Sequence, residues 1–197
     1  MSITREYQAE LRKQHEERGH WGSSAVRYGA GDDITVILNK KIYRGIKTVL
    51  DYGCGQGTLG DFIRENAPGR VKWFEYDPGI PGKDVKPEGQ FDLVLTTDVL
   101  EHVEPHLLDE TIAELASLTR LVMYNNIPNT PAGSDFITGP YVGQNLHLIV
   151  ESPEWWHEKI NGIVFPKFVR AEFRTIIRHG GCGDKTRCMF VHERVRK

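Results

Sequence analysis

Hydrophobic and polar positions near the start of the chain predict helices. Tyr7, Leu11 and His15 recur every four residues, so we expect an amphipathic helix over residues 3–18. A glycine-rich stretch then predicts a loop, and a second periodic apolar pattern predicts another helix. We therefore expect residues 1–45 to form an N-terminal helical cap or lid.

The rest of the chain, residues 46–197, is expected to form one domain in which strands and helices alternate. Short apolar runs predict strands at residues 47–52, 71–76, 91–96 and 120–125. A further short strand is expected around Val85. Amphipathic patterns predict helices at residues 58–65, at 105–118 and from 153 onward. The last two apolar runs predict an antiparallel hairpin, at residues 173–178 and 187–194. This order predicts an α/β fold with helices on both faces of a sheet.

Composition excludes several classes of protein. The chain has 197 residues, 39% of them hydrophobic and 26% charged, which is typical of a globular domain and not of a disordered chain. No apolar run reaches the ~20 residues that a membrane helix needs, so no membrane association is expected. The three cysteines, Cys54, Cys182 and Cys188, lack the paired spacing of a metal site and predict reduced thiols in a cytoplasmic protein.

Charge is distributed unevenly, although the formal net charge is only −2. Residues 159–197 contain ten Lys or Arg and three Asp or Glu, a balance of +7, so the preceding residues carry −9. Such a cluster is typical either of a solvated face or of a surface that binds an anionic partner such as nucleic acid. The sequence leaves both interpretations open.

A buried strand opens into glycines at residues 49–57, which read VLDYGCGQG. Glycines at this point let the backbone approach a ligand closely, with a helix N-terminus beyond. Asp51 would repel the pyrophosphate of NAD, whereas it would attract the ammonium and sulfonium groups of S-adenosylmethionine. Asp77 ends the next strand, where a carboxylate accepts hydrogen bonds from both ribose hydroxyls. The two acids together favour S-adenosylmethionine.

Three motifs resemble, in order and spacing, those of the class I S-adenosylmethionine-dependent methyltransferases. They are VLDYGCGQGTLGDFI at residues 49–63, FEYDP at 74–78 and FDLVLTTDVLEHVEP at 91–105. The resemblance covers about residues 47–125 and implies a Rossmann-like fold. That fold is a doubly wound, mostly parallel seven-stranded sheet with an antiparallel strand in the C-terminal hairpin. S-adenosylmethionine is the implied cofactor, and S-adenosylhomocysteine the implied product.

The same resemblance implies which residues contact the cofactor. Asp51 and the glycine loop would face the methionine part, Asp77 the ribose, and Asp98 with its neighbours the side that faces the acceptor. The implied contacts are Asp51, Gly53, Cys54, Gly55, Gly57, Asp77, Pro78, Asp98, Val99 and Leu100. Asp84 is the nearby carboxylate that would contact the adenine.

Two kinds of methyl acceptor are disfavoured by the residues that follow the strand at 91–96. Enzymes that methylate base amino groups usually carry an Asn/Asp-Pro-Pro-aromatic turn there, whereas this chain reads TDVL. Methylation of cytosine C5 needs a nucleophilic cysteine after a proline, and no cysteine of this chain fits. We therefore expect an oxygen or nitrogen atom of a small molecule as the acceptor. The alternatives are a nucleic-acid hydroxyl, such as an RNA 2′-hydroxyl, bound through residues 159–197, and a protein that binds the cofactor without catalysis.

Residues that handle the acceptor are expected beside a long connection rich in proline and glycine, residues 126–146. His147 follows it and is expected to act as a base or hydrogen-bond donor, because histidine titrates near neutrality. Asn145 and His102 are expected to assist. Aromatic residues of the N-terminal glycine-rich loop are expected to form a lid over the same mouth, namely Trp21 and Tyr28.

A metal site is an alternative for the same residues. Asp98, Glu101 and His102 are spaced at i, i+3 and i+4, so one helical turn presents all three on one side. Together with His147 they offer carboxylate and imidazole ligands for a divalent ion. The sequence alone favours no metal, because Leu-Glu-His is a common segment after this strand in the superfamily that the chain resembles.

Overall fold

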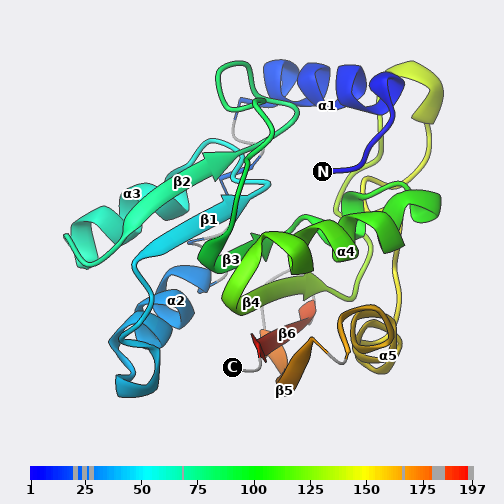
Figure 1. Cartoon of the computed structure of the whole chain (residues 1–197). Helices are drawn as coiled ribbons and strands as arrows, with labels where there is room; N and C mark the ends of the chain where they lie inside the picture. Colours follow the sequence, from blue (N-terminus) through cyan, green and yellow to red (C-terminus); the bar gives the residue numbers. More distant parts are fainter. Residues whose placement is uncertain are drawn as a thin grey trace.

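One sheet forms the centre of the computed structural model, which describes residues 1–19, 22–23, 26, 29–67, 69–165, 167–178 and 185–194 (Figure 1). Its strands are β1 (Thr48–Tyr52), β2 (Lys72–Tyr76), β3 (Phe91–Thr97), β4 (Thr119–Pro128), β5 (Phe168–Arg178) and β6 (Lys185–Arg194). They lie in the order β2-β1-β3-β4-β6-β5. The first four are parallel, and β6 is antiparallel to both β4 and β5. The predicted α/β sheet with an antiparallel C-terminal hairpin is confirmed.

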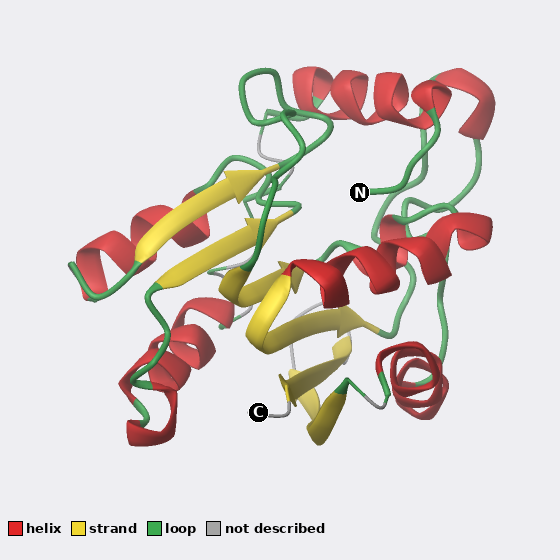
Figure 2. Ribbon diagram, in the orientation of Figure 1, coloured by secondary structure: helices red, strands yellow, loops and turns green. Residues whose placement is uncertain are grey.

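Helices cover both faces of this sheet (Figure 2). They are α1 (Arg5–Glu17), α2 (Ala30–Asn39), α3 (Thr58–Asn66), α4 (Leu108–Leu118) and α5 (Pro153–Val164). Short 3₁₀ turns add η1 (Lys41–Tyr43), η2 (Leu100–His102), η3 (Pro105–Leu107) and η4 (Gly139–Tyr141). None of the helices in the described part of the chain is long and apolar enough to cross a membrane.

The sheet has six strands in the described part of the chain, where seven were expected. The strand expected around Val85 does not form: residues 80–90 make turns and loop, and the Val85 side chain is 81% exposed. Pro81 and Pro87 remove backbone donors that a strand beside β2 would need, and no alternating apolar pattern surrounds them. β2 therefore lies at the edge of the sheet.

Two buried clusters fill the space between the sheet and its helices. One joins β3 and β4 to α4 and α5, with Leu115, Trp156 and Ile160 fully buried. The other joins the opposite face of the same strands to α2 and α3, with Ile34 and Leu59 in its centre. β3 is buried at every position because both of its faces are covered. α2 packs here against the sheet, whereas α1 lies elsewhere, and whether residues 1–45 act as one cap stays a prediction.

α1 lies beyond the arrowheads of β1 and β2, across the carboxyl ends of these strands (Figure 1). The side chain of Thr4 caps the helix by accepting a hydrogen bond from the Tyr7 backbone nitrogen, 3.2 Å away. Tyr7 and Leu11 then form a separate buried cluster with Phe136 and Leu146 of the long connection after β4. The predicted amphipathic helix is confirmed, and its apolar stripe holds that connection in place.

Glu104 forms hydrogen bonds with two segments that are distant from it in the sequence. Its buried carboxylate accepts hydrogen bonds from the backbone nitrogen and the hydroxyl of Thr4, at 2.8 and 2.9 Å. It also accepts one from the hydroxyl of Tyr141 in η4, at 2.8 Å. Bonds to an ionised acceptor are among the stronger hydrogen bonds in proteins. Glu104 therefore links the start of α1 to the connection after β4.

We expect Glu104→Gln to lower the free energy of unfolding by about 1.5–3 kcal/mol, because glutamine lacks the charge and turns one acceptor atom into a donor. Urea denaturation measures this change. Glu110→Gln, at an exposed position of α4, is the matched control and should change stability by less than ~0.5 kcal/mol. Equal losses in the two variants would show that Glu104 does not hold these segments together.

Candidate functional site

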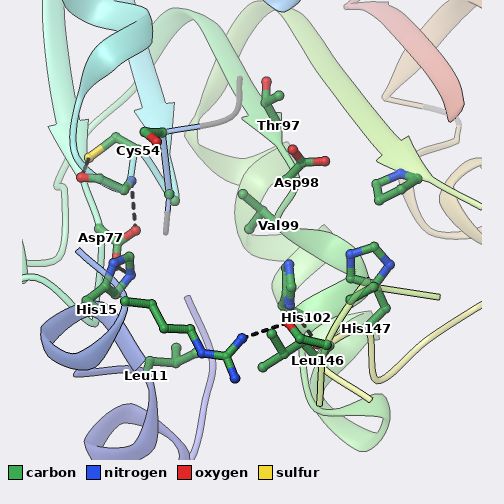
Figure 3. Close-up of a pocket in the computed structure, with 18 of the residues that line it drawn as sticks. Leu11, His15, Cys54, Asp77, Thr97, Asp98, Val99, His102, Leu146 and His147 are labelled. Atoms are coloured by element: carbon green, nitrogen blue, oxygen red, sulfur yellow. Dashed lines mark hydrogen bonds and ion pairs between the residues drawn. The ribbon is translucent and has the colours of Figure 1, made fainter. Parts of the chain in front are cut away.

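A cavity of about 480 Å³ opens at the carboxyl ends of the parallel strands, under α1 (Figure 3). This is the edge where open α/β sheets bind ligands. Most of the residues expected at the site line it, namely Asp51, Gly53, Cys54, Gly55, Asp77, Pro78, Asp98, Val99, His102 and His147. The lining does not include Gly57, Asp84, Leu100, Glu101 or Asn145. The expected site residues thus meet in one place, with five set back from the surface of the cavity.

Glycines after β1 allow two close backbone approaches. Gly53 has φ +80°, and a Cβ there would lie 2.5 Å from the Cγ2 atom of Val99. Gly55 has φ +52°, and a Cβ there would meet the Gly22 backbone, with the Gly22 Cα at 2.6 Å. The Gln56 backbone nitrogen donates to the Gly22 carbonyl at 3.1 Å. Gly55 is therefore needed to seat the N-terminal loop against the β1 turn, as well as to line the cavity.

Asp77 joins this turn to the neighbouring strand. Its carboxylate accepts hydrogen bonds from the backbone nitrogens of Gly55, at 2.9 Å, and Gly79, at 2.8 Å. His15 of α1 places its Nε2 atom 3.8 Å from the same carboxylate. A carboxylate has about four acceptor positions, so these contacts leave capacity for ligand hydroxyls. Figure 3 shows Asp77 and His15 together on one side of the cavity.

Asp51 presents to the cavity a buried carboxyl group with one unsatisfied oxygen. Its side chain is 2% exposed, and the Oδ2 atom has no hydrogen-bond partner in the described structure. Burial, followed by the negative charges of Glu75 and Asp77, raises the pKa of Asp51 to about 8. A bound cation would offset both causes, so the environment of Asp51 suits a positively charged ligand.

Asp98 turns the chain sharply at the end of β3. It is the one non-glycine residue of the described chain with positive φ, at +56°. The side chain forms an ion pair with Arg187 of β6, whose Nε atom also donates to the Asn126 Oδ1 atom at 2.8 Å. Arg187 is only 4% exposed. The sequence predicts a basic surface over residues 159–197, whereas the structure shows Arg187 buried beside the cavity.

Glu101, His102 and His147, which we call the Glu-His-His cluster, meet on another side of the cavity. The Glu101 side chain is 0% exposed, and neither of its oxygens has a hydrogen-bond partner in the described structure. The Nε2 atoms of His102 and His147 lie 3.7 and 4.0 Å from the Glu101 Oε1 atom. Burial and the charge of Asp98 raise the pKa of Glu101 well above its usual range.

The two histidine rings are oriented by main-chain carbonyls. The Nδ1 atom of His102 lies 2.7 Å from the Leu146 carbonyl oxygen, and that of His147 lies 2.6 Å from the Thr130 carbonyl oxygen. A carbonyl only accepts, so Nδ1 carries the proton in each ring and the lone pair of the neutral ring is on Nε2. Burial, followed by His147, lowers the pKa of His102 to about 4, so that ring is neutral at physiological pH.

Main-chain contacts bring His147 to η2 from a segment more than forty residues away. The Ile149 backbone nitrogen donates to the Glu101 carbonyl at 3.0 Å. The Asn145 amide binds the backbone of Ala132 and donates to the Asp135 side chain, while its Oδ1 atom accepts from the His147 backbone nitrogen at 3.0 Å. Asn145 therefore does not line the cavity itself but contacts Ala132 and His147, which do.

Other expected residues lie outside the cavity. Asp84 forms an ion pair with Arg12 at 2.7 Å. Leu100 packs in the α4–α5 core, and a Cβ on Gly57 would lie 2.5 Å from the Lys83 Nζ atom. The aromatic lid residues and one cysteine fall outside the described residues, namely Trp21, Tyr28 and Cys182.

Several residues of the cavity lining were not identified from the sequence as parts of the site, and three of them have basic side chains. His15 reaches the cavity from α1, Arg18 from the residue that follows α1, and Arg187 from β6. His15 follows Tyr7 and Leu11 on the apolar stripe of α1, so its inward direction could have been inferred from the spacing. Arg18 and Arg187 carry no comparable signal, because their partners are distant in sequence.

Comparisons with known proteins agree with this fold. A family model described as a methyltransferase domain matches residues 12–182. The 1,6-didemethyltoxoflavin-N1-methyltransferase of Burkholderia thailandensis, solved with its substrate and S-adenosylhomocysteine, is 16% identical, with a TM-score of 0.62 over 100% of this chain and 92% of that one. No curated protein matches the sequence.

Two further solved structures share the fold. The magnesium protoporphyrin IX methyltransferase of Synechocystis, solved with S-adenosylmethionine, is 15% identical, with a TM-score of 0.61 over 99% of this chain and 100% of that one. A chain of the Pnkp1/Rnl/Hen1 RNA repair complex is 16% identical, with a TM-score of 0.57 over 85% of this chain and 41% of that one. At these identities the structural likeness establishes the fold, and the family match carries the assignment.

We expect the wild type to lose stability relative to the Asp51→Asn variant as the pH rises. Folded Asp51 keeps its proton up to about pH 8, whereas unfolded Asp51 loses it near pH 4. The folded state therefore binds the extra proton, and the wild type loses up to about 1.4 kcal/mol per pH unit relative to the variant. Urea denaturation between pH 5 and 8 measures this difference. A difference that is constant with pH would show that Asp51 ionises normally.

Proposed function

The chain belongs to the methyltransferase-domain family of class I S-adenosylmethionine-dependent enzymes, and we propose that it methylates a hydroxyl oxygen of a small-molecule acceptor. One observation carries the proposal. A single cavity joins a place suited to a cation, beside Asp51, to two imidazoles suited to the acceptor, those of His102 and His147. The methyl donor is itself a cation, which suits the place beside Asp51. The acceptor must lose a proton, which suits the place beside the imidazoles.

The residues around β1 and β2 fit S-adenosylmethionine. The buried, unbonded Oδ2 atom of Asp51 attracts the positive charges of the methionine part. Asp77 retains acceptor positions for the ribose hydroxyls, and the glycine turn admits the ligand close to the backbone. Asp98 and Val99 then lie along the path toward the acceptor. No phosphate is required by this arrangement, and Asp51 would oppose one.

Methyl transfer to a hydroxyl requires the loss of a proton. The acceptor's O–H bond breaks, a new C–O bond forms, and the S–CH₃ bond of the sulfonium breaks to leave the neutral thioether S-adenosylhomocysteine. The protein contributes by aligning donor and acceptor and by favouring release of the proton. The Nε2 atoms of His102 and His147 face the only buried acid of this region without partners in the described chain, Glu101. We assign the Glu-His-His cluster to activation of the acceptor oxygen.

The nucleic-acid alternative draws less support from the described residues. In the basic region, Lys159 binds Asp109 at 2.5 Å, and Arg187 is buried against Asp98. Neither side chain is directed toward a phosphate backbone. A small acceptor also suits a cavity of about 480 Å³ that would have to take the cofactor as well.

The proposal is tested with radiolabelled S-adenosylmethionine and two acceptor pools, small metabolites and total RNA. We expect label in the small-metabolite pool, in a product stable to base in the way an ether is. Label in RNA, with binding that weakens steeply as salt rises, would support the alternative. Tight cofactor binding without transfer to either pool would favour a non-catalytic binding protein.

We expect Asp77→Asn to weaken S-adenosylmethionine binding by about 1–3 kcal/mol, because an amide is a poorer partner for two hydroxyl donors. Isothermal titration calorimetry measures the affinity. Asp109→Asn, at an exposed position outside the lining of the cavity, is the control and should bind as the wild type does. Wild-type affinity in Asp77→Asn would mean that the ribose lies elsewhere.

We expect His147→Ala to keep the wild-type fold and cofactor affinity but to lower turnover about 10²-fold or more. Asn145→Ala should lower turnover less, because it loosens the loop and leaves the imidazole in place. Circular dichroism, calorimetry and steady-state kinetics separate the three effects. Unchanged turnover in His147→Ala would remove this residue from acceptor activation.

A further inference from the structure

The Glu-His-His cluster has the composition and spacing of a metal site. Within the part of the chain that the structure describes, it is the one group of three potential ligands whose donor atoms all lie within 4.8 Å of one another. It combines one carboxylate from η2 with two imidazoles, one from the next residue and one from the connection after β4. The cluster adjoins the cavity, because both histidines line it.

We propose that Glu101, His102 and His147 bind a divalent transition-metal ion, such as Zn²⁺ or Co²⁺. The inference rests on the proposed function, because it assigns to this ion the activation of the acceptor oxygen. Two imidazoles and a carboxylate are ligands of borderline type, which suit these ions better than Ca²⁺ or Mg²⁺. Three protein ligands leave coordination positions open, as catalytic metal sites require.

The buried Glu101 carboxylate is the strongest argument for an ion. A structural carboxyl group in a protein interior is almost always hydrogen-bonded. Glu101 is completely buried, and no full hydrogen bond reaches either oxygen in the described structure, although the backbone amides of Glu101 and Val99 and the charge of Arg187 partly offset the effect of burial on its pKa. Its Oε1 atom instead faces the Nε2 atoms of both histidines, which cannot donate while Nδ1 holds the ring proton. A cation bound beside the Glu101 Oε1 atom would satisfy this carboxylate.

The distances require only a small contraction. Ligands at about 2.1 Å from one ion are separated from each other by roughly 3.0–3.5 Å. The Glu101 Oε1 atom lies 3.7 Å from the His102 Nε2 atom and 4.0 Å from the His147 Nε2 atom. Side-chain rotations that shorten these two distances by less than about 1 Å, and that bring together the two imidazole donors, which lie within 4.8 Å of each other, would complete the site.

Neighbouring groups already orient the proposed ligands. Metal-binding histidines usually donate their other ring nitrogen to a carbonyl or carboxylate, which fixes the ring and raises its basicity. His102 and His147 make such contacts with the carbonyls of Leu146 and Thr130. The bond from the Ile149 nitrogen to the Glu101 carbonyl keeps the two ligand segments in register.

Asp98 is not included in the proposed ligand set, although its spacing in the sequence suggested it. Its carboxylate is paired with the buried guanidinium of Arg187, which Asn126 also holds. These two charges offset each other. Glu101 therefore remains as the carboxylate available to a divalent ion.

An ion in this place would serve the proposed reaction directly. An acceptor hydroxyl that occupies an open coordination position loses its proton more readily, because the ion stabilises the resulting alkoxide. The proton passes to water, the alkoxide oxygen attacks the methyl carbon, and the sulfonium becomes a thioether. Atoms and charge balance without any oxidant or reductant.

The test is titration of the tag-free, chelator-treated chain with Co²⁺, followed by visible absorption, and with Zn²⁺, followed by calorimetry. We expect one equivalent to bind to the wild type. In Glu101→Gln and in His147→Gln the affinity should fall by more than the roughly 100-fold that supporting residues alone contribute. His106→Gln, at an exposed position of η3, is the matched control and should bind as the wild type does.

Cofactor binding distinguishes failure of this inference from failure of the proposed function. S-adenosylmethionine affinity and the melting temperature are measured on the same samples. Because the test uses two variants, Glu101→Gln and His147→Gln, it still gives a result if one of them does not fold. A wild type that binds the cofactor but no stoichiometric metal would overturn the metal site and leave the proposed function standing. Metal binding that is unchanged in both ligand variants would also overturn it. Methyl transfer that persists after chelator treatment would contradict the role of the ion and indicate that His147 itself takes the proton of the acceptor hydroxyl.

Discussion

A buried carboxylate oxygen without a hydrogen-bond donor is unfavourable, and two acids with such oxygens lie beside one cavity in this protein. Asp51 and Glu101 both have oxygens that no group of the described chain satisfies, and burial raises the pKa of each. Such groups persist when a ligand compensates them. A cationic cofactor would compensate Asp51, and a divalent ion would compensate Glu101. The glycine turn lies beside Asp51, and the two oriented histidines lie beside Glu101.

The fold supplies this arrangement through a few long-range contacts. α1 covers the strand ends, and its apolar stripe packs on the connection that carries His147. Glu104 joins the start of α1 to η4, and Asp77 joins the β1 turn to the end of β2. Both of these acids are charged acceptors in buried positions, where a hydrogen bond is stronger than in water. The cavity is therefore shaped by elements that are distant in sequence.

The sheet and the cofactor side could be predicted because their signals are local. An apolar run followed by glycines marks β1 and its turn, and a capping serine followed by proline marks the start of α5, where Ser152 accepts from the Trp155 nitrogen. The role of Arg187 could not be predicted, because its partner Asp98 lies 89 residues away. Likewise, the strand expected around Val85 had only one apolar residue to support it. Local patterns predict elements, whereas pairings between distant side chains require the folded structure.

The most direct test is a crystal structure of the chain with S-adenosylhomocysteine and an acceptor analogue that carries a hydroxyl. We expect the ribose hydroxyls at Asp77, the ammonium group near Asp51, and the thioether sulfur directed toward the acceptor hydroxyl at the Nε2 atoms of His102 and His147. S-adenosylhomocysteine in the opposite orientation, with its adenine at the Glu-His-His cluster, would contradict this assignment of the cavity. So would an acceptor bound away from both histidines.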